Sequence, residues 1–151
     1  MLVTDPNFAF AVTRTVRDFS GQRGRNIEPF LLVGLIHDRY AAVGASRARH
    51  YTPSLSRRDG RRYQAPAYGD ADTFPDWMEE RVLALLKSHY RADTERVTFL
   101  GHSYGSLLGL HALFTRPGLL ASYILGSPSL WFDVHVIFRT EETYATVNAD
   151  L

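Results

Sequence analysis

The run from Arg96 to Leu110, Arg-Val-Thr-Phe-Leu-Gly-His-Ser-Tyr-Gly-Ser-Leu-Leu-Gly-Leu, constrains the fold of this chain more than any other stretch. A short apolar segment turns abruptly into a helix of small residues, and the turn carries the pattern Gly-x-Ser-x-Gly. Gly101 and Gly105 let strand and helix approach closely, while Ser103 is held at an exposed corner. The alternative is an ordinary tight turn. Because a strand precedes the pattern and a helix follows it, we predict a nucleophile elbow with Ser103 as the catalytic residue.

Composition limits the number of domains, the chemistry and the cellular location that can be expected of this chain. With 151 residues, 45% hydrophobic and 22% charged, the chain is expected to form one globular domain with its own core. The absence of cysteine excludes disulfides, thiolate catalysis and zinc-cysteine sites. No His, Asp or Glu residues have metal-ligand spacing, so we expect no metal and no cofactor. No apolar run reaches the length of a membrane span and the first residues lack a signal-peptide pattern, so we expect a cytoplasmic protein that binds no membrane.

Strand and helix signals alternate along the first half of the chain. Residues 1–5 are predicted to form a short strand, and a helix with apolar residues at helical spacing follows the turn at residues 5–7 and ends near Gly21 (Phe8, Val12, Val16 and Phe19). The continuous apolar run 30–36 is typical of a strand covered on both faces. Residues 37–72 show no sustained period and are too long for a simple connection, so we expect an active-site loop or lid there.

The second half repeats the alternation. A helix is predicted to begin near residues 73–76 and to end near His89, and the elbow strand and helix follow. Residues 121–126 are predicted to form a fourth strand, and residues 133–147 a last helix with inward apolar side chains (Val134, Ile137, Phe138, Tyr144 and Val147). This order predicts the α/β class: a three-layer αβα arrangement with a parallel sheet of about four strands and ligands at their carboxyl ends.

Four motifs, in this order, give the chain a family resemblance. They are Asp5-Pro6-Asn7-Phe8, Arg47-Ala48-Arg49-His50-Tyr51-Thr52-Pro53, Gly101-His102-Ser103-Tyr104-Gly105 and Ser127-Pro128-Ser129-Leu130-Trp131-Phe132-Asp133. Together they resemble the esterase branch of the α/β-hydrolases that contains esterase-D-like enzymes and enterochelin-type siderophore esterases. The resemblance covers nearly the whole chain. It implies a partial α/β-hydrolase fold, hydrolysis of carboxylic esters, and the spatial strand order second, first, third, fourth.

The resemblance also implies a site. Ser103 would attack the ester carbonyl, and backbone N–H groups would hold the resulting oxyanion. One donor would be Tyr104, the residue after the nucleophile, and the other would come from the first loop at Asn7 or Phe8, because Pro6 has no N–H. The family more often has glycine at the positions of Pro6 and Ser106 and aspartate at the position of His50. The departure at Pro6 affects the expected shape of the first loop.

The resemblance further implies a catalytic acid and a histidine on loops after later strands, in the chain order Ser, acid, His. The residues after Ser103 are taken up by one helix, one strand and one further helix, so we interpret the chain as the central part of an esterase, truncated at both ends. The histidines present are poor substitutes. His37 beside Asp38 and His135 near Asp133 are minor candidates for a general base, whereas His89 and His111 are interpreted as structural.

The stretch from Arg47 to Tyr68 contains six arginines, all at or before Arg62, and three tyrosines: Tyr51, Tyr63 and Tyr68. It is either a solvated loop or a surface that overhangs Ser103 and contacts an anionic ester substrate. In the second case Arg49, then Arg47, would contact substrate, with His102 beside the nucleophile. A net charge of +1 and the lack of a nucleic-acid-binding fold argue against nucleic acid as a partner.

Two functions stay open at this point. The first is a serine esterase that acts on siderophore-type or other acyl esters. The second is a catalytically incomplete remnant or interaction module with the same fold. In either case the apolar strands 30–36 and 121–126, at the two ends of a truncated sheet, would be open edges. Such edges favour pairing with other copies, so we expect a homodimer, wider edge-to-edge association or poor solubility.

Overall fold

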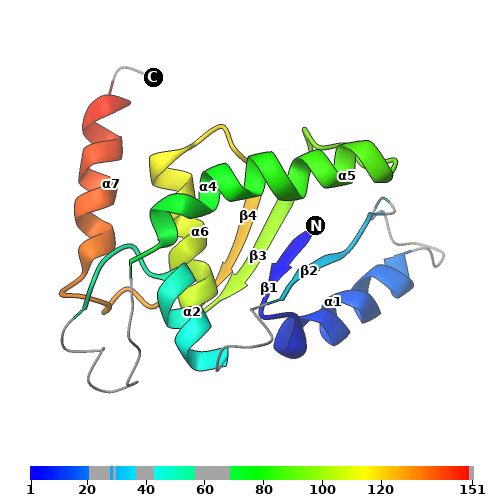
Figure 1. Cartoon of the computed structure of the whole chain (residues 1–151), viewed down its shortest axis with the longest axis horizontal. Helices are drawn as coiled ribbons and strands as arrows, with labels where there is room; N and C mark the ends of the chain where they lie inside the picture. The colour runs from blue at the N-terminus through cyan, green and yellow to red at the C-terminus, as the bar shows by residue number, and fades with distance from the viewer. Residues whose placement is uncertain (21–27, 29, 37–42, 57–68, 150–151) are drawn as a thin grey trace.

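The computed structural model describes residues 1–20, 28, 30–36, 43–56 and 69–149. Strand β1 (Leu2–Thr4) leads into helix α1 (Pro6–Ser20), and β2 (Val33–Leu35) is followed by helix α2 (Val43–Tyr51). A one-turn 3-10 helix, η1 (Ala71–Thr73), opens the next helical segment. That segment runs through α4 (Phe74–Trp77), the π-helical turn η2 (Met78–Leu83) and α5 (Ala84–His89) (Figure 1).

The last third of the chain contains the elbow and its neighbours. Strand β3 (Thr98–His102) is followed by helix α6 (Tyr104–Thr115), strand β4 (Ser122–Gly126) and helix α7 (Val136–Val147). The strands are all parallel and lie in the order β2-β1-β3-β4, which confirms the predicted order and the α/β class. Leu2 pairs with both Val33 and Phe99, and Phe99 pairs with Tyr123, so the nucleophile strand is internal.

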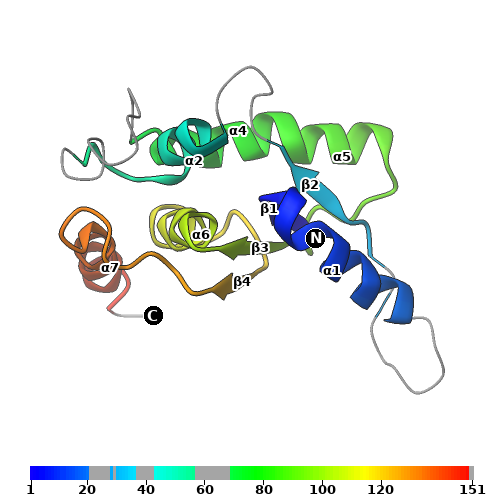
Figure 2. The ribbon, with the colours of Figure 1, turned by 90° about the horizontal axis from the view of Figure 1, so that it is seen from below.

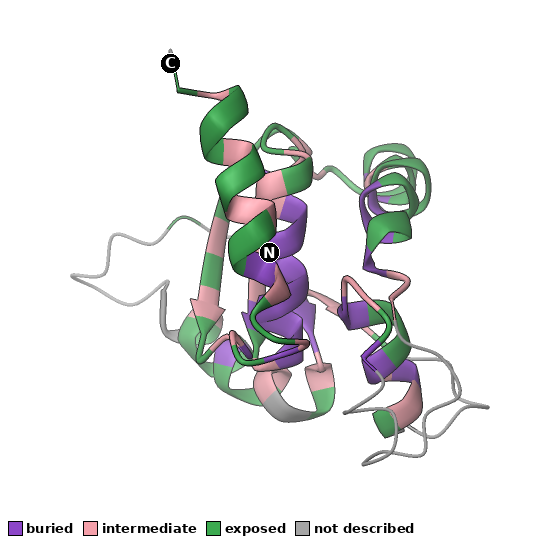
Figure 3. Ribbon diagram, turned by 90° about the vertical axis from the view of Figure 1, so that its left-hand side faces the viewer, coloured by how far each residue is buried: buried purple, intermediate pink, exposed green. Residues whose placement is uncertain are grey.

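Helices cover the two faces of the sheet unequally. Figure 2 shows α1 on one face near β1 and β2, and α6 with the α4 to α5 helix on the other. The core lies under α6, where Phe99, Leu107 and Leu108 are fully buried (Figure 3). On β4, Tyr123 and Leu125 pack against this core while Ser122 and Ile124 are exposed. The described residues form the predicted arrangement of a parallel sheet with helices on both faces. However, no described helix covers most of the face of β3 and β4 that lies opposite α6.

Three sequence expectations differ from the structure. Residues 37–72 show no sustained sequence period, yet within them Val43–Tyr51 form helix α2. The strand expected over residues 30–36 is short, and its residues are only partly buried. Helix α7 begins at Val136 rather than near residue 133, because the three residues before it have positive φ angles. Of the five apolar residues predicted to face inward there, Ile137 is buried and Tyr144 partly so, whereas Val134, Phe138 and Val147 are exposed.

Candidate active site

Ser103 lies at the turn between β3 and α6, with a backbone conformation that few residues other than glycine adopt. Its φ of 56° and ψ of −116° place it outside the ordinary helical and extended regions. Such a conformation costs about 1–3 kcal/mol and persists only where the surroundings impose it. The elbow geometry that the sequence predicts is therefore present.

The two glycines of the elbow permit very close packing. A Cβ atom added to Gly101 would lie 2.5 Å from the carbonyl carbon of Gly105, closer than real Cβ atoms approach such groups. A Cβ added to Gly105 would collide with the hydroxyl oxygen of Thr4 on β1. Helix α6 therefore starts directly against the ends of β3 and β1, and this contact holds Ser103 at the carboxyl edge of the sheet.

Backbone and side-chain hydrogen bonds tie the elbow to the end of β4. The Ser103 N–H donates to the Gly126 carbonyl oxygen (3.1 Å), and the Ser129 N–H donates to the Ser103 carbonyl oxygen (3.4 Å). The Ser103 and Ser129 hydroxyl oxygens lie 3.1 Å apart. The buried Ser106 hydroxyl lies 2.7 Å from the Gly101 carbonyl oxygen and 2.9 Å from that of Gly126. A serine where the family often has glycine thus links the elbow with the end of β4.

The predicted oxyanion donors lie at the N-termini of two helices. Tyr104 is the first residue of α6, and Asn7 and Phe8 are in the first turn of α1. The first N–H groups of a helix point out of its end and favour negative charge. Because β1 and β3 are parallel neighbours, both helices start at the same edge of the sheet. The arrangement is compatible with an oxyanion hole, and the assignment of its donors stays a prediction.

The loop after β1 is fixed by an ion pair that the sequence did not predict. Asp5 has a positive φ of 51°, and its carboxylate accepts two hydrogen bonds from the Arg47 guanidinium, at 2.7 and 2.9 Å. The Arg47 guanidinium carbon lies 5.8 Å from the ring centroids of both Tyr51 and Tyr104. Burial raises the pKa of the Tyr51 hydroxyl, and the neighbouring Asp5 carboxylate raises it further. Arg47 therefore connects α2, the first loop and the residue after the nucleophile.

Arg49 and His102 are the other two residues predicted to contact substrate. Arg49 forms an ion pair with Asp70 just before η1. His102, the last residue of β3, is exposed, and a Cβ atom added to Gly126 would lie 3.6 Å from its Cδ2 atom. The structure thus shows Arg47 and Arg49 paired with carboxylates and His102 over the end of β4. Their roles in substrate binding stay predictions.

The histidines that could serve as a base do not hydrogen-bond Ser103 within the described part of the chain. His111 is buried in α6, with Nε2 2.7 Å from an Asp72 carboxylate oxygen, and His89 is exposed beside Ser88. The ring of His135 packs near Phe138. His37 lies outside the described residues. Among the residues described, no three His, Asp or Glu side chains come together as a possible metal site.

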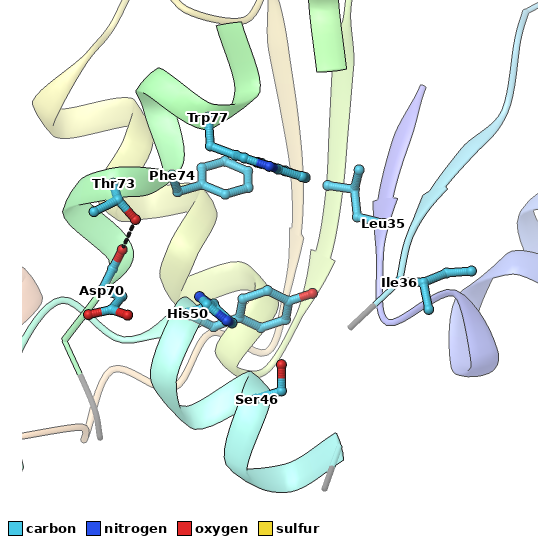
Figure 4. Close-up of a pocket in the computed structure, with 9 residues that line it drawn as sticks. Leu35, Ile36, Ser46, His50, Asp70, Thr73, Phe74 and Trp77 are labelled. Atoms are coloured by element: carbon cyan, nitrogen blue, oxygen red, sulfur yellow. Dashed lines mark hydrogen bonds between the residues drawn. The ribbon is translucent and has the colours of Figure 1, made fainter. Parts of the chain in front are cut away.

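A cavity of about 420 Å³ opens between the end of β2, helix α2 and helix α4. Its lining is mainly apolar and aromatic and includes Leu35, Tyr51, Phe74 and Trp77 (Figure 4). Sequence patterns could not predict this cavity, because its walls come from segments far apart in the chain. Ser129 belongs to the fourth sequence motif, but its contact with Ser103 could not be predicted from the sequence.

The sheet order and the elbow have the arrangement of the α/β-hydrolase fold. Comparison with known protein families assigns the chain to one family with this fold. Residues 31–148 match the family described as "Putative esterase", so the chain belongs to that esterase family. Within the described residues, no helix is long and apolar enough to cross a bilayer.

Named relatives agree with this assignment. The chain is 27% identical to the ferri-bacillibactin esterase BesA of Bacillus subtilis over 151 residues, an alignment that covers 95% of this chain and 52% of that protein. It is 45% identical over 78 residues to the siderophore triacetylfusarinine C esterase of Aspergillus fumigatus, covering 51% of this chain and 27% of that protein. The chain therefore spans about half the length of BesA and a smaller part of the fungal enzyme.

Solved structures show the same fold. The BES protein from Bacillus cereus superposes with a TM-score of 0.81 at 24% identity, over 99% of this chain and 56% of that chain. The siderophore hydrolase EstA from Aspergillus nidulans gives a TM-score of 0.78 at 25% identity, over 99% of this chain and 52% of that chain. The four-stranded sheet and its helices thus match about half of each of these structures.

Proposed function

We propose that the chain carries the nucleophile of a serine-dependent carboxylic ester hydrolase, with Ser103 as that nucleophile. The observation that carries the proposal is the strained backbone of Ser103 at a strand-to-helix turn, in a chain that belongs to an esterase family. Strain at such a corner presents the hydroxyl to a substrate at the carboxyl edge of the sheet.

The proposed reaction proceeds in two steps. The Ser103 Oγ attacks the ester carbonyl carbon and loses its proton to a base. The carbonyl oxygen becomes an oxyanion that accepts hydrogen bonds from the N–H of Tyr104 and from that of Asn7 or Phe8. Collapse of this intermediate breaks the ester C–O bond, and the alcohol leaves with a proton. Water then hydrolyses the acyl-serine to release the acid and restore the hydroxyl.

The scheme requires a base that accepts the Ser103 proton, and no residue is assigned to that role. In the described part of the chain the Ser103 hydroxyl is hydrogen-bonded to Ser129, and no imidazole reaches it. This observation favours a second candidate function, a catalytically incomplete form of the same fold. The two differ in whether the Ser103 hydroxyl is reactive in the folded chain.

We propose siderophore-type esters as substrates, because both relatives named above are siderophore esterases. The test is incubation of the folded chain with triacetylfusarinine C or enterobactin and mass spectrometry of the products. Hydrolysis should yield the free acid and alcohol with the unmodified chain and with Ser127→Ala, an exposed serine of the neighbouring loop, but not with Ser103→Ala.

Two outcomes separate the parts of this proposal. If neither siderophore ester is cleaved but a simple aryl acetate is hydrolysed in a Ser103-dependent way, the substrate class is wrong and the nucleophile is right. If the Ser103→Ala variant cleaves the ester as fast as the unmodified chain, the assignment of the nucleophile is wrong.

A further inference from the structure

The cavity beside β2 has the walls of a binding site. Figure 4 shows the indole of Trp77 extending from α4 toward Leu35 on β2, with Phe74 beside it. Tyr51 contributes a third aromatic side chain from α2. A volume of about 420 Å³ is within the range of small-molecule sites, which are mostly apolar with a few polar groups. Aromatic rings on several sides favour a flat ligand that stacks or packs edge to face.

One polar group in the wall has no partner. The Ser46 hydroxyl is buried, with 4% of the residue exposed, and no hydrogen bond satisfies it. Figure 4 shows it pointing from α2 toward the space beside His50. A buried polar group without a partner destabilises the folded state, and such groups require an explanation. Serine has three staggered rotamers, so this hydroxyl can turn toward a polar atom that enters the cavity.

The charges around the cavity favour a neutral ligand. Asp70 lines it, but its carboxylate is already paired with Arg49. Burial holds the Tyr51 hydroxyl in its neutral form because it raises the pKa of that group. The described lining contains no Arg or Lys. Apart from the imidazole of His50, an anionic ligand would meet no cationic side chain in the described lining, and it would lose its hydration.

We propose that this cavity binds a neutral aromatic ring that carries one hydrogen-bonding group, a phenol for instance, with the Ser46 hydroxyl as its polar anchor. The site is separate from the reaction at Ser103, so the proposal goes beyond the function proposed above. Arg47 lies between the two regions, because its guanidinium carbon is 5.8 Å from the ring centroids of both Tyr51, which lines the cavity, and Tyr104, which follows Ser103.

Binding can be followed through Trp77. The chain has two tryptophans, and Trp131→Phe leaves Trp77 as the single indole reporter. In this background para-cresol should change the fluorescence of Trp77 saturably, with a Kd on the order of 1 mM, as expected for a ligand of its size. Toluene, which lacks the hydroxyl, should bind about fivefold more weakly, because it leaves Ser46 without a partner. The para-toluate anion should not bind in the same range.

Three variants in the same background assign the effect to the cavity. Ser46→Ala should bind para-cresol and toluene with similar affinity. Ser88→Ala, a matched change on α5 outside the cavity, should keep the fivefold preference. Ser103→Ala should also keep it, so that the result does not depend on the esterase proposal.

Either of two results would overturn the inference. One is the absence of any saturable change with para-cresol up to its solubility limit in the folded chain. The other is an equal affinity for para-cresol and toluene before Ser46 is changed, since that would show an apolar cavity without a polar anchor.

Discussion

At the scale of single residues, the elbow depends on two glycines, Gly101 and Gly105, and on the strained backbone of Ser103. Gly101 and Gly105 leave room for α6 to start against β3 and β1, and Ser103 takes up the unusual φ and ψ angles. The sequence predicted this geometry because the pattern is local. It could not predict the hydrogen bond between Ser103 and Ser129 or the ion pair between Asp5 and Arg47, because these residues are 26 and 42 positions apart.

The first prediction concerns Gly101. Replacement by alanine should lower the free energy of unfolding by about 1–3 kcal/mol, because the new methyl group collides with rigid backbone at Gly105. Gly44→Ala is the matched control: nothing lies within 4 Å of its added Cβ, so stability should stay the same or rise slightly. Urea unfolding followed by circular dichroism measures both. Equal midpoints for Gly101→Ala and the unmodified chain would contradict the packing described for the elbow.

The second prediction concerns Tyr51 at high pH. Its pKa in the folded state lies above the ordinary value of about 10, so above that pH the unfolded state has lost a proton that the folded state keeps. The free energy of unfolding should then fall as the pH rises, by up to about 1.4 kcal/mol per pH unit from this residue alone.

Tyr51→Phe removes that contribution, so the stability lost between pH 9.5 and 11 should be about 1 kcal/mol smaller in the variant. Urea titrations at the two pH values measure this difference, and the remaining tyrosines cancel in the comparison. An identical loss in both proteins would show that Tyr51 ionises normally in the folded chain.

At the scale of elements, the parts with strong local patterns were predicted and the parts held by tertiary contacts were not. Helix α1, strand β3 and helix α6 follow from apolar spacing and turn residues. Helix α2, with the sequence Val-Gly-Ala-Ser-Arg-Ala-Arg-His-Tyr, has little apolar periodicity. It is held in place by the burial of Ala48 and Tyr51 and by the ion pair of Arg47. Such contacts cannot be seen in a sequence read one segment at a time.

The third prediction compares the two ion pairs of α2. The side chains of Arg47 and Asp5 are only 26% and 14% exposed, whereas those of Arg49 and Asp70 are 55% and 33% exposed. Arg47→Met should lower the free energy of unfolding by about 2 kcal/mol, because it leaves a largely buried carboxylate without its partner. Arg49→Met should cost less than about 1 kcal/mol, as is usual for exposed pairs. If thermal unfolding shows equal losses, Arg47 does not fix the loop after β1.

At the scale of the whole molecule, the sheet ends at β2 on one side and β4 on the other. Strand β4 is the longer edge, and Ile124 on its bare face is 51% exposed. Unprotected edges of this kind pair with other chains. The sequence predicted open edges from the expected truncation, but it could not show that one face of β3 and β4 is also uncovered, because that depends on how the helices are divided between the two faces.

The fourth prediction is association of two copies through the β4 edge. Light scattering coupled to size exclusion should give a dimer mass at micromolar to millimolar concentration. Ile124→Lys should restore the monomer, because a charge on an edge strand opposes pairing. Ile36→Lys, at the end of β2, serves as the control and should leave the dimer intact. A monomer at all concentrations before any substitution would contradict this prediction.

The most direct test of the account is covalent labelling of Ser103 with a fluorophosphonate, which reacts with activated serine hydroxyls. The folded chain is incubated with the reagent, digested, and mapped by mass spectrometry, with Ser103→Ala and Ser127→Ala as variants. The account predicts one phosphonate adduct, on Ser103, in the unmodified chain and in Ser127→Ala, and none in Ser103→Ala. A folded chain that remains unlabelled, or an adduct that persists in Ser103→Ala, would contradict the assignment of Ser103 as the nucleophile.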